Sequence, residues 1–370
     1  MVMGLINKNK PKFYSLDNIL EKNARYNIIF GERSNGKTYS VLKYALEQYG
    51  KSKKTLAIIR RWQEDFKSKR GATIFNALVE NGEIERVTNG EYDSVYYQSM
   101  RWYFCKFDEN LGKRIIADEP FAYGFSLNNM EHDKMTSYPT ITTILFDEFI
   151  TRETYLVDEF VIFVNTLSTI IRYRDDVKIF MLGNTVNQFC PYFTEMGLKH
   201  ISKMNKGEID LYTYGNSGLV VAVEYADSPD KKNGKPSDVY FAFDNPKLNM
   251  IKGGAWEIDI YPHLPVKYRP NDVIFTYFIK FEIYTLQCEV IQIDDLYFTY
   301  IHLKTTPLKN EDEDLIYCLD YSPKPNWRRY ISRPLDRASQ KIWWFFVHDK
   351  VFYQNNEIGE IVRNYLSCCK

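Results

Sequence analysis

The 370-residue sequence has few of the features that mark a metal-binding, disulfide-rich or membrane-spanning protein. Its six cysteines show no C-x-x-C spacing and its five histidines are scattered, so neither a zinc site nor a disulfide framework is predicted. It contains no uncharged apolar run of about 18 residues, and residues 1–10 lack the apolar segment of a signal peptide. We therefore expect a cytosolic protein that does not contact a membrane.

The formal net charge is zero, because 48 Lys and Arg residues balance 48 Asp and Glu residues. The charges are nevertheless unevenly distributed along the chain. Residues 1–70 hold 16 basic and 6 acidic residues, an excess of +10, whereas residues 282–320 hold 2 basic and 9 acidic residues, a net −7. A basic face is compatible with a polyanionic partner, because neutralising phosphates releases counterions. The alternative is that these lysines and arginines only solvate the surface.

A phosphate-binding loop is the most specific motif in the sequence. Gly31-Glu32-Arg33-Ser34-Asn35-Gly36-Lys37-Thr38 fits the pattern G-x-x-x-x-G-K-[ST] at every required position. In this motif the glycines let backbone N–H groups surround the phosphates, the lysine reaches the outer phosphates, and the threonine hydroxyl ligates magnesium. The apolar run Ile28–Phe30 predicts a strand before the loop, and an amphipathic helical pattern follows it. The sequence therefore predicts binding of a nucleoside triphosphate with Mg²⁺.

A second motif places two acids after a buried strand. Ile144-Leu145-Phe146 runs directly into Asp147 and Glu148, as buried strands of a parallel sheet do where function lies at their carboxyl ends. Asp147 would hold the magnesium ion, and Glu148 would orient and deprotonate an attacking water. The alternative is an exposed acidic pair without a catalytic role.

The order of strand and helix signals predicts the fold class. The first 200 residues alternate strands and helices, with an additional strand at residues 178–182 between the two motif strands in the sheet, as in ASCE phosphate-loop NTPases. We predict an α/β domain over residues 1–200, with a RecA-like parallel sheet between helices. Residues 201–258 are predicted to be a linker region, and residues 259–370 a smaller α+β domain rich in aromatic and β-branched residues.

Two further positions are candidates for roles at the first site. Asn184 follows the strand at residues 178–182 directly, where its amide could contact the γ-phosphate or the attacking water; alternatively it only starts a turn. Arg172 and Arg174 end the helix predicted after the acidic strand. Either could reach a neighbouring subunit's nucleotide as an arginine finger, or only interact favourably with the helix C-terminus.

Four segments together resemble the DNA-packaging motor ATPases of small short-tailed phages, the phi-29-like type. They are G-E-R-S-N-G-K-T at residues 31–38, Y-P-T-I-T-T-I-L-F-D-E-F-I at 138–150, I-R-Y-R-D-D-V at 171–177 and L-G-N-T-V-N-Q-F-C-P-Y-F at 182–193. The resemblance covers about residues 13–193. It implies an ATP- and Mg²⁺-dependent ring, homopentameric in that family, which acts at the portal vertex of an empty procapsid in the host cytoplasm and drives double-stranded DNA inward.

The resemblance also implies roles for individual residues. Lys37 and Thr38 match the Walker A pair, and Asp147 and Glu148 match the magnesium-binding and catalytic acids. Arg172 occupies the position of the arginine finger that acts across the subunit interface. Lys134, thirteen residues before Asp147, matches a second basic residue thought to act across that interface, with a solvated lysine as the alternative.

The second domain of the family resembles an RNase H-type nuclease that has lost its catalytic acids. In this sequence Asp294, Asp295 and Asp320 have no spacing that would bring them to one two-metal site, so we expect no nuclease activity. Residues 324–341, which include Trp327 and Tyr330, are a candidate contact for nucleic acid or the portal. Lys67, Lys69 and Arg70 are candidates for gripping DNA, and the favoured alternative is that they only solvate the surface.

Three functional classes are therefore in play. The first is a motor that translocates double-stranded DNA, the second a complete terminase that also cuts DNA, and the third a nucleotide-dependent clamp or switch that transports nothing. Ring size, and whether a structural RNA joins the assembly, are left open by the sequence.

Overall fold

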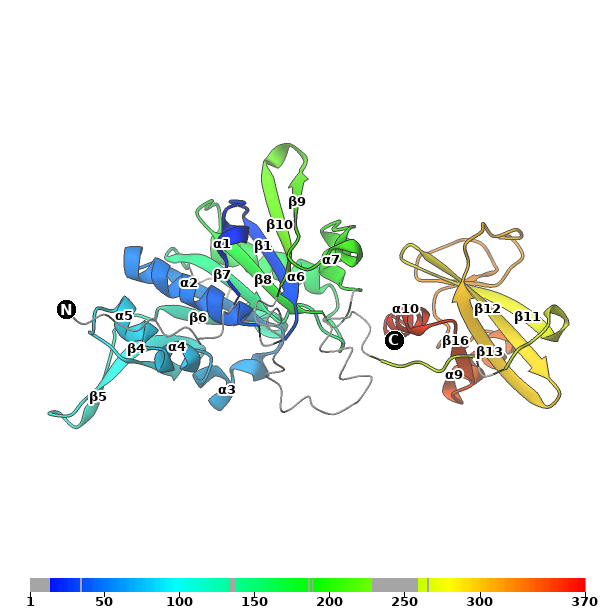
Figure 1. Cartoon of the computed structure of the whole chain (residues 1–370), viewed down its shortest axis with the longest axis horizontal. Coiled ribbons are helices and arrows are strands. Elements are labelled where there is room, and N and C mark those ends of the chain that lie inside the picture. The colour runs from blue at the N-terminus through cyan, green and yellow to red at the C-terminus, as the bar shows by residue number, and fades with distance from the viewer. Residues whose placement is uncertain are drawn as a thin grey trace, which may run out of the picture. The chain divides into compact units, whose positions relative to one another are not determined.

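A computed structural model of the protein describes residues 14–33, 35–132, 137–185, 187, 189–227, 259–264 and 266–369. The described residues fall into two compact units, residues 14–227 and residues 259–369 (Figure 1). None of the described helices is long and apolar enough to cross a membrane.

The first unit is built on a ten-stranded sheet. Its strands are β1 (Tyr26–Gly31), β2 (Thr55–Arg60), β3 (Ser94–Gln98), β4 (Arg101–Asp108), β5 (Lys113–Ile116), β6 (Ala122–Ser126), β7 (Ile141–Asp147), β8 (Lys178–Asn184), β9 (Ile209–Tyr214) and β10 (Leu219–Ala226). Their order is β3-β4-β6-β2-β7-β8-β1-β10-β9, and β5 pairs with β4. The strands from β6 to β10 in this order are parallel to one another, whereas β4 and β9 are antiparallel to their neighbours.

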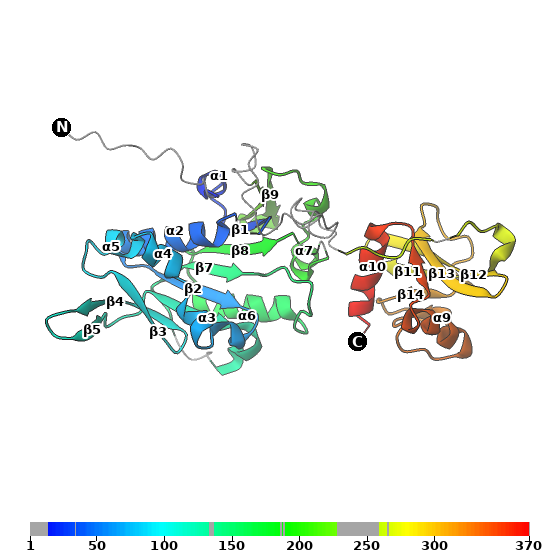
Figure 2. The same cartoon turned by 60° about the horizontal axis from the view of Figure 1, so that its bottom comes forward.

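Helices cover both faces of this sheet (Figure 2). They are α1 (Asp17–Leu20), α2 (Lys37–Ser52), α3 (Lys69–Ala72), α4 (Asn76–Glu80), α5 (Glu83–Val87), α6 (Glu159–Ile171) and α7 (Pro191–Glu195). Successive residues of a strand point to opposite faces of the sheet, and each face has its own hydrophobic core. Ile29 therefore packs with α2, while Ile28 and Phe30 pack with α6 and α7. Burial on both faces explains why the central strands are almost continuously apolar, which is typical of parallel sheets.

Strand order confirms the predicted ASCE arrangement, because β8 lies between β1, which precedes the phosphate-binding loop, and β7, which ends in Asp147. Part of the predicted linker region, residues 209–226, instead forms β9 and β10 of this sheet. The reason is the run Leu219–Ala226, whose residues from Val221 onward are buried and pair in parallel with β1. The first unit therefore extends past the boundary predicted at residue 200.

The second unit contains a six-stranded mixed sheet and two helices. Its elements are β11 (Val273–Phe281), β12 (Tyr284–Ile293), β13 (Leu296–Leu303), β14 (Ile316–Cys318), β15 (Trp327–Arg328), α9 (Arg337–Val347), β16 (Val351–Tyr353) and α10 (Asn356–Ser367). Strands β11, β12 and β13 form an antiparallel meander, while β14 and β16 run parallel to β11 and β13.

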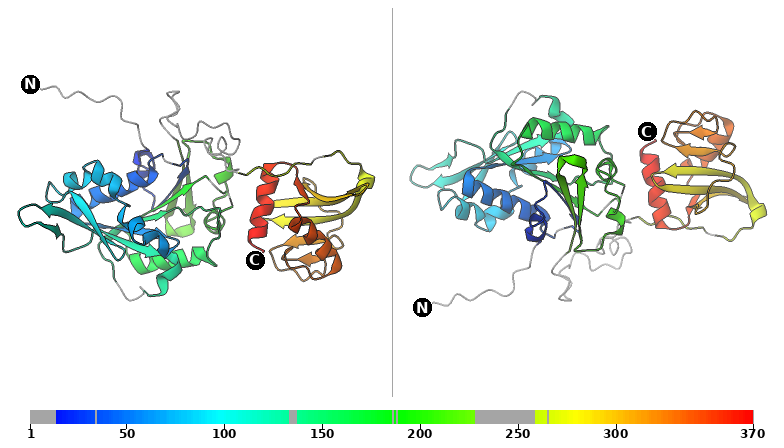
Figure 3. Two further views of the ribbon diagram at one scale, coloured as in Figure 1. Left: turned by 90° about the horizontal axis from the view of Figure 1, so that it is seen from below. Right: turned by 90° about the horizontal axis from the view of Figure 1, so that it is seen from above.

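Side-chain caps begin both helices of the second unit, since Asp336 accepts a hydrogen bond from the Ser339 N–H and Asn355 accepts one from the Ile358 N–H. Helix α10 packs against β13 and β16 (Figure 3). The unit is α+β, as predicted.

Candidate nucleoside triphosphate site

The carboxyl ends of three neighbouring parallel strands, β1, β7 and β8, form the candidate site, with the phosphate-binding loop between β1 and α2. Gly36 precedes α2 with a φ of 93°, a left-handed conformation that glycine adopts without strain. Gly31 ends β1 close to β10, where a Cβ atom would lie 2.9 Å from the Ala226 carbonyl oxygen. Both glycines of the motif are thus required by local geometry.

Lys37 is held at the centre of the loop. Its Nζ atom donates hydrogen bonds to the Glu32 carbonyl oxygen at 2.6 Å, Asn35 Oδ1 at 3.1 Å and Asn184 Oδ1 at 3.5 Å. Burial lowers the pKa of Lys37 to about 8, although Asp147 and Glu32 act in the opposite direction. The ammonium group is therefore shielded from solvent and held by neutral oxygen atoms that a phosphate could replace.

Thr38 and Asp147 provide adjacent oxygen atoms at the end of β7. The Thr38 hydroxyl donates to Asp147 Oδ1 at 3.3 Å. Hydroxyl and carboxylate oxygens are the ligands that Mg²⁺ prefers in proteins, so this pair fits the ion that the sequence predicts. Burial raises the pKa of Asp147, while the nearby Arg60 opposes that shift.

Glu148 follows Asp147 in a strained conformation. Its φ of 61° is left-handed, which is uncommon for a residue with a side chain and costs of order 1 kcal/mol. The turn places the carboxylate at the mouth of the site, where the side chain is 65% exposed.

Arg60 is a site residue that sequence reasoning missed. It is the last residue of β2, the strand next to β7, and its guanidinium lies 3.3 Å from Asp147 Oδ2 and donates to Glu148 Oε2 at 2.8 Å. The guanidinium therefore bridges both acids of the second motif. The sequence shows Arg60 at a strand end, but only the pairing of β2 with β7 brings it to the acids.

The residues surround a cleft of about 390 Å³. Its lining consists of Arg33, Asn35, Gly36, Lys37, Thr38, Tyr39, Asp147, Glu148, Leu182, Gly183 and Asn184. The structure thus brings most of the predicted site residues together in one cavity. Gly31 and Glu32 support the loop from outside the lining, and Ser34 and Lys134 lie outside the described residues.

Hydrogen bonds link the phosphate-binding loop to β10. The residues that form this strap are Tyr14, Asn35, Ser40 and Glu224. The Tyr14 N–H donates to the Asn35 carbonyl oxygen at 3.0 Å, and Ser40 Oγ donates to the Tyr14 carbonyl oxygen. The Tyr14 hydroxyl donates to Glu224 Oε2 on β10 at 2.5 Å, and both side chains are buried. Sequence reasoning missed this strap because Tyr14 and Glu224 are far apart in the chain.

Arg172 lies near the amino ends of the parallel strands, opposite the end that carries the cleft. Helix α6 leads away from the acids of β7 and ends at Ile171, and Arg174 donates hydrogen bonds to the carbonyl oxygens of Tyr138 and Pro139 just before β7 begins. The six residue steps along β7 from Ile141 to Asp147, at about 3.3 Å each, separate this end of the strand from Asp147 by about 20 Å. Arg174 is thus used within its own unit, whereas the exposed Arg172 is not brought to the cleft of its own chain.

The candidate DNA-gripping cations are exposed but partly neutralised. Lys67 pairs with Glu64 at 2.9 Å, and Arg70 lies 3.9 Å from Asp65. Exposed pairs of this kind contribute little to stability, but they reduce the local positive charge.

The structure does not bring Asp294, Asp295 and Asp320 together. Asp294 and Asp295 form the turn after β12, near the start of β11, whereas Asp320 follows β14 near the end of β11. The registers place the two groups about 25 Å apart along the strands. Among the described residues, no group of three or more His, Cys, Asp or Glu side chains could hold a metal ion.

The basic segment at residues 324–341 is partly neutralised within the second unit. Lys324 pairs with Asp312 at 2.8 Å, and Arg328 pairs with Asp336 at 3.4 Å. Arg329 stacks over the ring of Tyr321, with its Cζ atom 3.9 Å from the centroid. Aromatic rings and cations of this segment therefore contact one another as parts of a folded surface.

Together, the P-loop after β1, the paired acids after β7 and the strand between them define a P-loop NTPase fold of the ASCE class. The chain belongs to the Podovirus DNA encapsidation protein (Gp16) family, whose profile matches residues 8–234. This membership confirms the resemblance drawn from the motifs.

Two curated relatives of this chain are DNA packaging proteins of Bacillus phages. The DNA packaging protein of Bacillus phage phi29 is 26% identical over 192 residues, 50% of each chain, and that of Bacillus phage B103 is 24% identical over 207 residues, 55% of each chain. The aligned part of the chain thus spans about half the length of these curated relatives.

In fold, the chain is similar to the bacteriophage Phi-29 viral genome packaging motor assembly, with a TM-score of 0.56, 17% identity, and coverage of 97% of this chain and 99% of that one. It is also similar to the Phi-28 gp11 DNA packaging motor, with a TM-score of 0.53, 17% identity, and coverage of 98% and 99%.

Proposed function

We propose that the protein is an ATP-driven motor that moves double-stranded viral DNA into a preformed procapsid. One observation carries this proposal: Lys37, Thr38, Asp147 and Glu148 line one cleft, which supports binding and hydrolysis of a triphosphate there. Membership of the encapsidation family and the names of the phi29 and B103 relatives support DNA packaging as the use of that hydrolysis.

Binding would begin with an exchange of partners at Lys37. The outer phosphates of ATP would replace the Glu32, Asn35 and Asn184 oxygens that now surround the ammonium group. Backbone N–H groups of the loop and the N-terminus of α2 would face the remaining phosphate oxygens. Thr38 and Asp147 would hold Mg²⁺, which when bound neutralises charge on the phosphates.

Hydrolysis would then depend on Glu148. Its carboxylate would accept a proton from a water that attacks the γ-phosphorus, and Asn184 would orient that water or contact the γ-phosphate. Arg60 donates to Glu148 Oε2 at 2.8 Å while the Glu148 side chain stays 65% exposed, so the acid is held in place and is still open to water. Arg60 would thus position the carboxylate that accepts the proton.

A ring of subunits would complete the site. Arg172 is about 20 Å from its own acids, so it can act as an arginine finger only on a neighbouring copy, where it would stabilise charge developing on the transferred phosphoryl group. Lys134 is proposed to act at the same interface. We propose a pentamer that assembles at the portal vertex in the host cytoplasm, with a structural RNA as a further partner left open.

Of the alternatives, a terminase with an active nuclease is disfavoured by the separation of Asp294 and Asp295 from Asp320. A clamp or switch that hydrolyses ATP without transport would share the whole site, so only an assay of movement separates it from a motor. A manganese-dependent cleavage assay addresses the nuclease directly.

The decisive test is ATP-driven DNA uptake into purified empty capsids by the full chain, comparing the wild type with Glu148→Gln. We expect the variant to bind ATP normally but to package no DNA, because the amide cannot take the proton. Glu153→Gln, at an exposed position beyond the cleft, is the matched control and should package like the wild type. Normal packaging by Glu148→Gln would refute the catalytic assignment, and hydrolysis without uptake by the wild type would favour the clamp.

A further inference from the structure

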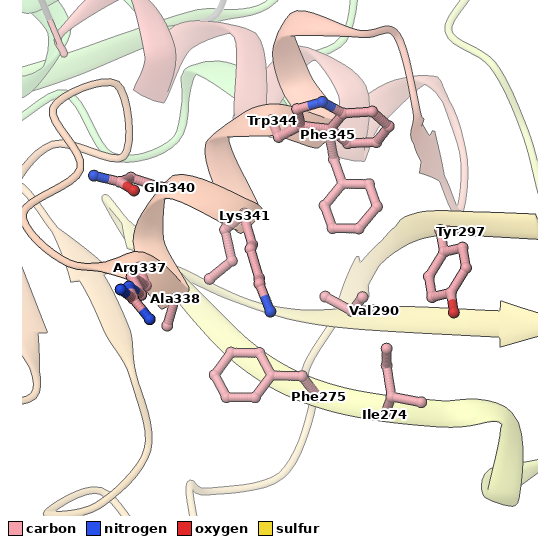
Figure 4. A pocket seen from close by; sticks show the side chains of 11 residues that line it. Ile274, Phe275, Val290, Tyr297, Arg337, Ala338, Gln340, Lys341, Trp344 and Phe345 are labelled. Carbon is pink, nitrogen blue, oxygen red and sulfur yellow. The ribbon is translucent and has the colours of Figure 1, made fainter.

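The second unit carries a large groove between its sheet and α9 (Figure 4). Its volume is about 1070 Å³, and its lining is mainly apolar. The sheet contributes Ile274, Phe275, Val290 and Tyr297, and α9 contributes Ile342, Trp344 and Phe345. Phe275, Tyr297 and Trp344 are each more than 40% exposed, which is unusual for large apolar side chains that share one patch.

Two cations are the charged residues of this lining. Arg337 and Lys341 lie one turn apart on α9, and the side chain of Lys341 extends from the helix toward Phe275 (Figure 4). Within the part of the chain that the structure describes, neither cation forms an ion pair, whereas the neighbouring Asp336 is used by Arg328 and by the Ser339 N–H. The groove therefore offers an apolar floor beside two cations without partners.

This combination fits a polypeptide with an apolar side chain flanked by carboxylates. A nucleic acid would bring a row of phosphates, for which two cations beside a mainly apolar surface of this size are a poor match. An acidic segment with an exposed aliphatic or aromatic residue would instead bury the apolar surface and pair both cations.

The other end of the same sheet has these properties. The β11–β12 turn exposes Ile283 at 89%, next to Glu282. The register of Lys280 with Cys318 brings Asp320 level with Glu282, and Tyr321, 85% exposed, follows it. This surface, Glu282, Ile283, Asp320 and Tyr321, is hereafter the acidic tip. Arg329, which stacks over the ring of Tyr321, brings a cation to this surface.

The acidic tip cannot reach the groove of its own chain. Ile274 and Phe275 lie at the beginning of β11 and the acidic tip lies beyond its end, so the seven residue steps from Phe275 to Glu282, about 23 Å, separate the two surfaces. A contact between them must join two copies, and because the two surfaces differ, the contact is head to tail and can close into a ring.

We infer that the acidic tip of one copy inserts into the groove of the next, so that the second units form a head-to-tail interface of the ring. Glu282 and Asp320 of one copy would pair with Arg337 and Lys341 of the other, and Ile283 would cover the apolar floor. This inference rests on the proposed function, because it supplies contacts for the ring that the motor requires.

A charge swap in the full-length protein tests the interface. The first variant is Arg337→Glu with Lys341→Glu, the second is Glu282→Lys with Asp320→Lys, and the third combines all four substitutions. Self-association is measured by sedimentation velocity with a non-hydrolysable ATP analogue. We expect the first and second variants each to associate about tenfold more weakly or worse, and the third to recover most of the loss.

Recovery in the combined variant would show that all four substitutions are compatible with a folded chain that associates, so the loss in the first two variants comes from the mismatched charges. Wild-type association by the first variant, or no recovery in the third, would overturn the inference. Normal self-association of the first variant with loss of capsid binding would also overturn it, because the groove would then hold a capsid protein. Binding and hydrolysis of ATP by the wild type test the proposed function separately, since the four substituted residues lie outside the nucleotide cleft.

Discussion

Replacing Tyr14 with Phe should destabilise the first unit by a predictable amount. The substitution removes one oxygen atom and leaves the ring in place, but the Glu224 carboxylate, 4% exposed, loses the hydroxyl that donates to it at 2.5 Å. A hydrogen bond to a charged group contributes about 1.5–3 kcal/mol. We therefore expect the free energy of unfolding to fall by about 2 kcal/mol at neutral pH, which lowers the melting temperature by about 4–8 °C in a unit of this size.

The loss should also depend on pH. Burial raises the pKa of Glu224, and the Tyr14 hydroxyl opposes that shift, so the pKa should rise further in the variant. A carboxyl group with a raised pKa in the folded state keeps a proton that the unfolded state releases. Its contribution to the free energy of unfolding is therefore present at low pH and is lost as the pH rises. The deficit of Tyr14→Phe should thus be larger at pH 8 than at pH 5.

Thermal unfolding at both pH values, followed by calorimetry without nucleotide, measures this effect. Tyr44→Phe is a suitable control, because Tyr44 also packs in the core of the first unit, against Phe180, and no hydrogen bond of its hydroxyl is found in the described part of the chain. We expect the control to melt like the wild type at both pH values. An unchanged melting temperature for Tyr14→Phe, or an equal deficit at pH 5 and pH 8, would refute the reasoning.

Three other predictions concern the cleft. Arg60→Gln removes the guanidinium that bridges Asp147 and Glu148, so kcat for ATP hydrolysis should fall about 10- to 100-fold with a smaller change in KM, and unchanged kinetics would contradict a positioning role. Because burial lowers the pKa of Lys37 to about 8, its charge is lost above that pH, and the affinity for ATP measured by titration should be weaker at pH 9 than at pH 7; equal affinities would mean that the ammonium stays charged. Mixing Arg172→Ala subunits with Lys37→Ala subunits should restore hydrolysis at mixed interfaces, and an absence of recovery at any ratio would count against an arginine that acts on a neighbour.

The sequence by itself determined the features that depend on neighbouring residues in the chain. The phosphate-binding loop needs its glycines, lysine and threonine at fixed spacing, so Gly31–Thr38 could be read directly. The buried strand before Asp147 and the helix at residues 159–171 follow from local apolar patterns, which also predicted the extra ASCE strand. These patterns are local because the spacing of apolar residues within one strand or helix decides which of its faces is buried.

Only the tertiary structure decided which strand ends meet. Arg60 reaches Asp147 and Glu148 because β2 pairs with β7, and Tyr14 reaches Glu224 because β10 pairs with β1. The same pairing moved residues 209–226 from a predicted linker into the sheet. Strand order is set by how all the apolar faces pack together, and no short stretch of sequence contains that information. The motifs of the cleft were therefore predictable, whereas the groups that hold and control them were not.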